Sequence, residues 1–214
     1  LKKGTKVYVP DRLEKGKINF FGMLEEDKVI KPVIPEEIAP YLTLVDSPEE
    51  ADVALVLMES PQSLGYNDDD RLGEKGYLPI SLQYRPYTAV SAREQSIGQG
   101  DYRETENPNR SYKGKTAVCY NEKDLDNVIE MRRIMGDKPV VAVLTVANMT
   151  VPAEFEPYLD ALLVDFYVDR KATYTILTGG AEPSALLPFI MPADMVTVET
   201  HCEDLPFDMS PYTD

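Results

Sequence analysis

An unbroken apolar run occupies residues 53–58 (VALVLM) and ends abruptly at Glu59-Ser60-Pro61. A strand that is apolar on both faces is typical of a parallel sheet covered by helices on each side. The run therefore predicts the central strand of an α/β sheet. In such sheets ligands bind beyond the carboxyl ends of the strands. We expect any chemistry of this chain to begin at Glu59 and in the polar segment that follows it.

The same kind of pattern predicts the other regular elements. Asn121 is a predicted N-cap, with Asp124 three residues on and Gly136 as the stop, and Asp169 caps a later helix. Strands are predicted at residues 6–9, 41–45, 116–120, 139–146, 161–166 and 185–191, and helices at 121–135, 152–159 and 171–178. Strands that alternate with helices call for right-handed crossovers and a mostly parallel sheet, which is a three-layer α/β/α sandwich.

Residues 60–114 show no sustained period and are rich in Gly, Pro, Asp, Arg and Tyr. A segment of this length without regular elements is usually a binding loop or disordered. Its six tyrosines favour order, because disordered segments contain few aromatic residues. We expect one domain, residues 1–214, that carries this long loop.

Composition narrows the class of partner. The net charge of −15 argues against nucleic acid and anionic membrane surfaces, because binding to phosphate needs clustered Lys and Arg. No window reaches the roughly 18 apolar residues of a membrane span. Cys119 and Cys202 are expected to be unrelated buried thiols, and His201 is the single histidine. With no Cys/His cluster and no Gly-rich phosphate loop, we expect no metal and no cofactor.

Several phrases of the sequence resemble one protein family. Residues 180–192 (GAEPSALLPFIMP) are similar to the stretch G-x-x-N-P-S-G-K-L-P-x-T-x-P of family 3 glycoside hydrolases. Residues 51–58 resemble the A-D-V-A-I-V-F strand of the same C-terminal α/β sandwich domain, and residues 165–168, 204–207 and Tyr212 fit it in order. Glu182, Ala185 and Leu186 depart from the family pattern.

The resemblance implies a β-glucosidase-like retaining exo-hydrolase that acts on β-glycosides. In that family a (β/α)₈ barrel precedes this domain and carries the nucleophilic aspartate. Because no barrel is present and the chain begins with Leu1, we expect it to be part of a longer enzyme, inactive on its own. The family also suggests a periplasmic or secreted location. The rival interpretation is a non-catalytic carbohydrate-binding or interaction module on the same fold, and the upstream reading frame would distinguish the two.

A retaining glycosidase needs two carboxyl groups about 5–5.5 Å apart, one of them the acid/base. The family's acid/base glutamate lies in a G-E-G-Y phrase, and ungapped alignment from Ala51 places Leu64 on it. Leucine cannot donate a proton. Glu59 is therefore the candidate acid/base, since it ends the central strand and precedes a proline. The alternative is that Glu59 caps the turn that follows.

The candidate substrate-binding residues lie in the long loop. Sugar sites use aromatic faces and bidentate charged hydrogen bonds. The candidates are Asp68, Asp69, Glu74 and Arg93. Three consecutive aspartates do not match the alternate spacing of a calcium loop, and a solvated turn is the simpler interpretation of 68–70. Packing of the loop's arginines in internal ion pairs remains the alternative for Arg93.

Overall fold

A computed structural model describes residues 1–16, 18–63, 66–67, 76–91, 113–117, 119–202 and 205–213. Its contacts divide the chain into two compact units. The first, here called the sheet unit, comprises residues 1–60, 121–148 and 154–188. The second, the loop unit, comprises residues 61–120, 149–153 and 189–214.

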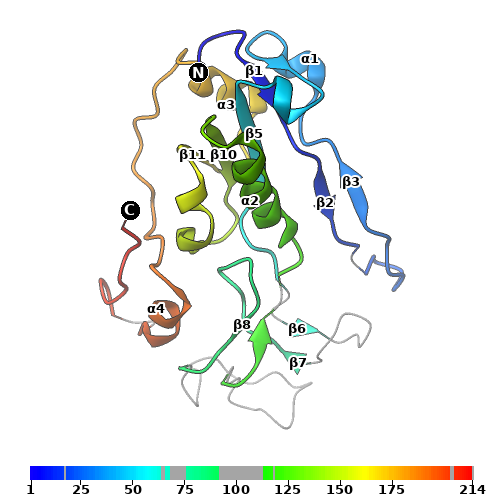
Figure 1. Cartoon of the computed structure of the whole chain (residues 1–214). Coiled ribbons are helices and arrows are strands. Elements are labelled where there is room, and N and C mark those ends of the chain that lie inside the picture. Colours follow the sequence, from blue (N-terminus) through cyan, green and yellow to red (C-terminus); the bar gives the residue numbers. More distant parts are fainter. Residues whose placement is uncertain are drawn as a thin grey trace. The chain divides into compact units, whose positions relative to one another are not determined.

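The sheet unit is built on five parallel strands in the order β11-β10-β5-β1-β4. Their bounds are β1 Lys6–Tyr8, β4 Thr43–Leu44, β5 Val53–Glu59, β10 Val140–Thr145 and β11 Ala161–Asp165. The five corresponding predicted strands are confirmed, and Figure 1 shows β5, β10 and β11 as neighbours. The chain runs outward from β1 in both directions, so the order reverses between β1 and β5. That position is the topological switch point of the sheet.

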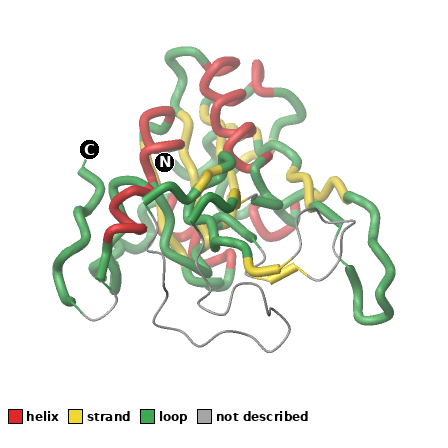
Figure 2. The backbone as a smooth tube through the Cα atoms, turned by 90° about the horizontal axis from the view of Figure 1, so that it is seen from below, coloured by secondary structure: helices red, strands yellow, loops and turns green. Residues whose placement is uncertain are grey.

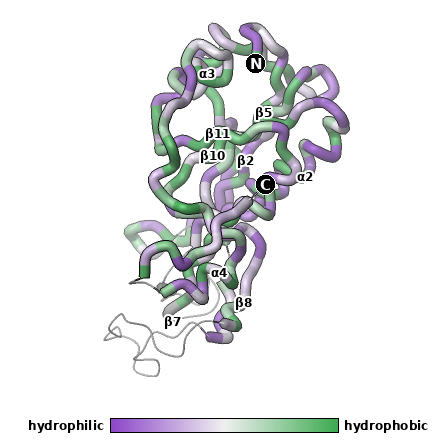
Figure 3. The backbone as a smooth tube through the Cα atoms, turned by 90° about the vertical axis from the view of Figure 1, so that its left-hand side faces the viewer, coloured by the Kyte–Doolittle hydropathy of each residue, from purple (hydrophilic) through white to green (hydrophobic). Residues whose placement is uncertain are grey.

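Helices cover both faces of this sheet (Figure 2). On one face, alternate residues of β5 and β10 pack with Ile38 of α1 (Pro35–Ile38) and Tyr174 of α3 (Arg170–Leu177). On the other face, α2 (Lys123–Met135) contacts β5 and β10 and buries Leu125, Val128 and Met131. The apolar sequence of both central strands follows from this two-sided burial (Figure 3). The three-layer α/β/α architecture is confirmed.

The ends of the helices agree with the sequence only in part. Asp169 caps α3 as predicted, since its carboxylate accepts the N–H of Lys171, and α2 ends at Gly136 with φ of 58°. Asn121 does not cap α2: the N-cap is Glu122, which makes no side-chain capping bond. The helix predicted at 152–159 is instead two 3₁₀ turns, η3 Pro152–Glu154 and η4 Glu156–Tyr158. A further 3₁₀ turn, η1 Pro48–Glu50, leads into β5.

A two-stranded antiparallel ribbon follows β1. It pairs β2 (Arg12–Glu14) with β3 (Lys28–Ile30), and Arg12 lies opposite Ile30. This ribbon could not be predicted from the sequence, because three-residue strands among glycines and charges leave no period to detect. Residues 12–30 are called the arm below (Figure 1).

The loop unit contains short elements. They are β6 Tyr66–Asn67 with β7 Gly76–Tyr77, β8 Tyr87–Thr88 with β9 Thr116–Ala117, and the helix α4 Met195–Thr200. The strand predicted at 116–120 is thus a two-residue partner of β8 and lies outside the parallel sheet. A helix was not expected after Asp194, yet Asp194 caps α4 by accepting the N–H of Thr197.

The strand predicted at 185–191 does not form. Leu186 in that segment is 94% exposed, and Pro188 removes an N–H that a ladder would need. Cys119 and Cys202 do not form a disulfide, as expected. Cys119 is buried, but Cys202 is exposed, so the expectation that both thiols are buried was wrong for Cys202. Across the described parts of the chain, no helix combines the length and apolar character needed to cross a membrane.

Candidate functional site

Polar side chains end three adjacent strands at the carboxyl edge of the sheet. Glu59 ends β5, Thr145 ends β10 and Asp165 ends β11, and Thr145 is in register with both carboxylates. The position of Glu59 at the end of the central strand agrees with the sequence analysis. Asp165 is engaged locally: its carboxylate accepts the N–H of Tyr167 and a bond from Arg170.

Arg12, the first residue of β2, forms a fork of hydrogen bonds next to the switch point. Its Nε and Nη2 each lie 2.9 Å from one carboxylate oxygen of Asp124, which is on α2. Its Nη1 lies 3.1 Å from Oε1 of Glu59. Such bidentate pairing of Arg with a carboxylate fixes geometry as well as energy. One guanidinium therefore joins β2, α2 and the end of β5.

Asp124 is the most enclosed member of this group, with only 1% of its surface exposed. In addition to the bond from Arg12, Oδ2 of Asp124 accepts hydrogen bonds from the backbone N–H of Glu59 at 3.1 Å and from Nδ2 of Asn121 at 3.0 Å. A buried carboxylate is tolerated when several donors satisfy it. The charge of Asp124 is thus neutralised by Arg12 and its oxygens are satisfied by neighbouring donors.

The electrostatics of Arg12 follow from this enclosure. Burial acts to lower the pKa of the Arg12 guanidinium, but its bonds with Asp124 and the charges of Asp124 and Glu59 raise that pKa overall. Arg12 therefore keeps its proton at any pH at which the protein is folded. The contact with Glu59 is consequently a permanent charge-assisted hydrogen bond.

Asn121 and Ser60 complete the arrangement. Nδ2 of Asn121 lies 2.9 Å from the carbonyl oxygen of Glu59 and 3.2 Å from that of Ser60. The hydroxyl of Ser60 accepts the N–H groups of Ala147 and Asn148, just after β10. The chain that leaves β5 is therefore held from two sides. We call Arg12, Glu59, Ser60, Asn121 and Asp124 the polar cluster.

The polar cluster is suited to positioning more than to binding. Its donors and acceptors are directed at one another, at the switch point where open α/β sheets usually hold a ligand. No group of three or more His, Cys, Asp or Glu suited to a metal ion occurs among the residues that the structure describes. The cluster thus fixes where the segment after Glu59 begins.

The other candidates from the sequence lie outside the described residues. This applies to Asp68, Asp69, Glu74 and Arg93, and also to Leu64. Their positions and their roles therefore stay predictions. Glu59 is the one candidate site residue for which geometry is available.

Sequence reasoning missed Arg12 altogether and assigned Asn121 and Asp124 only to a helix cap. One signal was present: Asp124 lies one turn before Val128, on the apolar stripe of α2. An acid on the buried face of a helix needs a cationic partner. The sequence alone could not identify that partner, because Arg12 is 112 residues away.

A second feature belongs to the loop unit. An open hollow of about 520 Å³ is lined mainly by apolar side chains, which are Met149, Phe189, Ile190, Leu205, Pro206, Phe207 and Met209 together with His201. Asp208 accepts the N–H of Cys202 at 2.7 Å and contacts Nδ1 of His201. The bond from Cys202 is the main cause of the lowered pKa of Asp208, and His201 adds to it. This hollow is apolar and presents few of the polar groups that a sugar requires.

Comparison with known proteins finds similarity to two fungal β-glucosidases. The chain is 26% identical to probable β-glucosidase C of Aspergillus flavus over 166 residues, which is 78% of this chain and 19% of that protein. It is 30% identical to β-glucosidase C of Emericella nidulans over 76 residues, 36% of this chain and 12% of that protein. No family profile and no solved structure matches the chain. The chain spans less than a fifth of the length of these relatives, and over part of its own length it is weakly homologous to fungal β-glucosidases, which are glycoside hydrolases.

Proposed function

We propose that this chain is the C-terminal α/β sandwich domain of a family 3 glycoside hydrolase with β-glucosidase-like specificity. The observation that carries the proposal is the similarity to β-glucosidase C over 78% of the chain. The three-layer fold with a parallel sheet is consistent with it. In this proposal a (β/α)₈ barrel, encoded in the same longer protein, supplies the catalytic nucleophile. The present chain supplies loop residues to a sugar site that the two domains share.

The segment after β5 is the proposed contribution to that site. Asp68, Asp69, Glu74 and Arg93 would form hydrogen bonds with the hydroxyl groups of a β-glycoside. Carboxylate and guanidinium groups suit this task, because a single group of either kind can bind two neighbouring hydroxyl groups in a bidentate manner. The polar cluster supports the proposal, since it fixes the start of the segment through Ser60 and Asn121.

Two roles are open to Glu59 within this function. The first is the acid/base expected from sequence, for which a proton must be held and released during each turnover. The second is a positioning residue, whose carboxylate holds Arg12 in place. The 3.1 Å bond from the permanently charged Arg12 supports the positioning role, because the carboxylate is already engaged in holding Arg12. In that case the proton donor comes from residues 68–74 or from the barrel.

The proposal is tested with the full-length protein and an aryl β-glucoside. First, the reading frame upstream of Leu1 should encode a barrel with a catalytic aspartate. The purified full-length protein should then hydrolyse the β-glucoside with retention at the anomeric carbon, while the 214-residue chain should not. An upstream sequence without a barrel, or a full-length protein that binds sugars without hydrolysing them, would support the carbohydrate-binding module instead.

A further inference from the structure

The long segment that follows β5 is held together at its two ends. It comprises residues 61–120 and lies between Ser60 and Asn121 in the sequence. The N–H of Tyr120, its last residue, donates to the carbonyl oxygen of Gln62, its second residue, at 2.8 Å. The point where the chain leaves the end of β5 and the point where it returns are therefore neighbours. The segment is thus a loop that is closed at its base.

The side-chain amide of Asn121 strengthens this closure. Its Nδ2 lies 2.9 Å from the carbonyl oxygen of Glu59 and 3.2 Å from that of Ser60, the last two residues before the segment. It also lies 3.0 Å from Oδ2 of Asp124, which accepts the N–H of Glu59 as well. All three neighbours of Nδ2 are acceptors, so the amide nitrogen and not the amide oxygen faces them. One side chain at the return point of the segment therefore holds the residues from which the segment departs.

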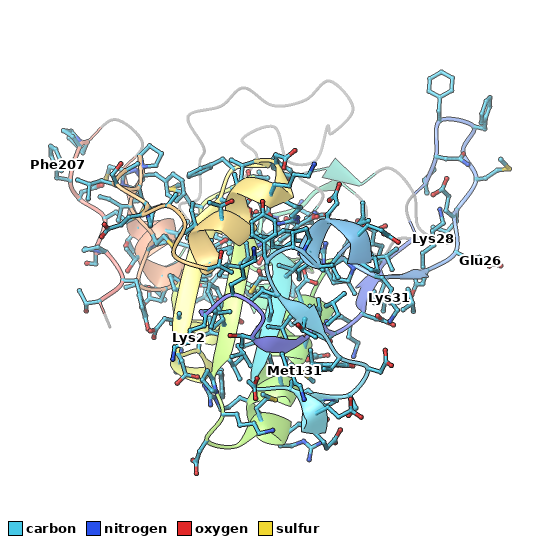
Figure 4. The ribbon with its side chains drawn as sticks, turned by 90° about the horizontal axis from the view of Figure 1, so that it is seen from above. Lys2, Glu26, Lys28, Lys31, Met131 and Phe207 are labelled. Carbon is cyan, nitrogen blue, oxygen red and sulfur yellow. The ribbon has the colours of Figure 1, made fainter. Side chains whose placement is uncertain are left out.

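The helix that follows does not account for this amide. The N-cap of α2 is Glu122, whose side chain makes no capping bond, and α2 packs on the sheet through apolar residues such as Met131 (Figure 4). Asn121 is only 5% exposed, so water has little access to its contacts. An amide supplies two hydrogens without a charge, whereas a serine supplies one and an ionised aspartate supplies none. The residue type at position 121 thus matches the task of holding two carbonyl groups.

Further hydrogen bonds extend the closure into the segment. Oγ of Ser63 accepts the N–H of Ser81 at 2.9 Å. β8 pairs with β9, and beyond this ladder the N–H of Ala89 donates to the carbonyl oxygen of Lys115 at 2.9 Å. Described parts of the segment are therefore bonded to residues close to its base. Release of the base should loosen these parts as well.

We propose that Asn121 is a positioning residue of the sugar site. Its amide closes the base of the segment, and the closed base restricts the positions open to the predicted substrate-binding residues, which are Asp68, Asp69, Glu74 and Arg93. Asn121 acts through these residues and not by a contact of its own with the sugar. Misplacement of such groups by about 1 Å costs about 10²-fold in rate. This inference rests on the proposed function, because that proposal gives the segment its role in sugar binding.

The test is kcat/KM of the full-length protein on an aryl β-glucoside from about pH 5 to about pH 9. Asn121→Asp is nearly isosteric but removes both donor hydrogens once its new carboxyl group ionises. Burial and the carboxylates of Asp124 and Glu59 raise the pKa of that group, while Arg12, which is paired with both, opposes them. The ratio of kcat/KM between variant and wild type should therefore be highest in acid, where the protonated group keeps one donor hydrogen, and should fall about tenfold or more as the pH rises. Asn127→Asp on α2 is the matched control, since its amide also donates to a backbone carbonyl oxygen at 2.9 Å, and its ratio should not change with pH.

A second variant and hydrogen exchange separate positioning from folding. Asn121→Ala removes the donors without adding a charge, so its kcat/KM should lie about tenfold or more below wild type at every pH. In both Asn121 variants, amide exchange of the full-length protein should become faster in residues 76–91 and 113–117 and stay unchanged in β10.

Two outcomes overturn the proposal. Wild-type kcat/KM in the Asn121 variants at every pH would show that the closure does not place the site, and faster exchange in β10 as well as in the segment would show that Asn121 acts on folding in general. If the wild-type protein hydrolyses no β-glucoside, the proposed function fails by itself. The exchange measurement then still decides whether Asn121 closes the segment, because unchanged exchange in its variants excludes that role.

Discussion

Replacement of Arg12 by methionine should destabilise the sheet unit strongly. Arg12→Met keeps most of the aliphatic length but removes three hydrogen bonds and leaves the carboxylate of Asp124 buried without its cation. Loss of one partner from a buried ion pair costs about 3–5 kcal/mol. Asp124 would keep two donors, the N–H of Glu59 and Nδ2 of Asn121. We therefore expect Arg12→Met to lower the free energy of unfolding by about 3 kcal/mol, near the lower end of that range.

The assay is urea unfolding followed by far-UV circular dichroism, with two further variants. Lys31→Met removes an exposed ion pair with Asp11 at the root of the same arm and should cost less than about 1 kcal/mol. Arg12→Met/Asp124→Asn should be less destabilised than the sum of its single variants, because no charge is left buried. The reasoning is refuted if Arg12→Met costs no more than Lys31→Met, or if the two changes at positions 12 and 124 are additive.

Three other outcomes are expected. The purified 214-residue chain should not hydrolyse aryl β-glucosides, because the nucleophile is proposed to lie in the barrel; turnover abolished by a single carboxylate change would contradict this. If Glu59 is the acid, Glu59→Gln in the full-length enzyme should slow the hydrolysis of substrates with poor leaving groups by about 10²–10⁴-fold, and that of substrates with good leaving groups far less. Equal losses of turnover on both kinds of substrate would identify Glu59 as a positioning residue. The pKa of Asp160 is lowered mainly by the N–H of Val140 and then by Arg132. The contribution of Asp160 to the free energy of unfolding is therefore complete above the ordinary aspartate pKa of about 3.9, and it is lost as the pH falls through the lowered pKa. The stability gap between wild type and Asp160→Asn, about 0.5–1 kcal/mol for this exposed pair, should therefore be full at pH 7 and should shrink in acid; a gap that does not change with pH would exclude the ionic role.

The sequence predicted the layered architecture because the main strands are buried on both faces. β5 and β10 are buried along almost their whole length, and only continuous apolar runs permit that. The arm escaped prediction for the opposite reason. Its strands are three residues long, and Arg12 at the start of the first one is held by a long-range bond to Asp124. Propensity and period contain no information on such pairings.

The candidate site was predictable only at one position. Glu59 could be placed because a strand end is visible in the sequence as the loss of apolar residues. Its partner could not, since nothing local to Glu59 indicates that Arg12 reaches it. Asn121 illustrates the same limit: it has the residue type of an N-cap, but its amide instead bonds with the backbone of Glu59 and Ser60. Tertiary contacts overrode the local preference.

The central claim is that residues of this chain line a sugar site, and the most direct measurement is kcat/KM of the full-length protein on an aryl β-glucoside. Four single variants are compared, Asp68→Asn, Asp69→Asn, Glu74→Gln and Arg93→Met, with Asp137→Asn as an exposed control after α2. Loss of a hydrogen bond to a charged group is worth about 1.5–3 kcal/mol. We expect at least one of the four to lose tenfold or more in kcat/KM with unchanged thermal unfolding, and the control to lose nothing. A tenfold loss corresponds to about 1.4 kcal/mol. If kcat/KM of all four variants stays within about twofold of wild type, this segment takes no part in the site and the claim is contradicted.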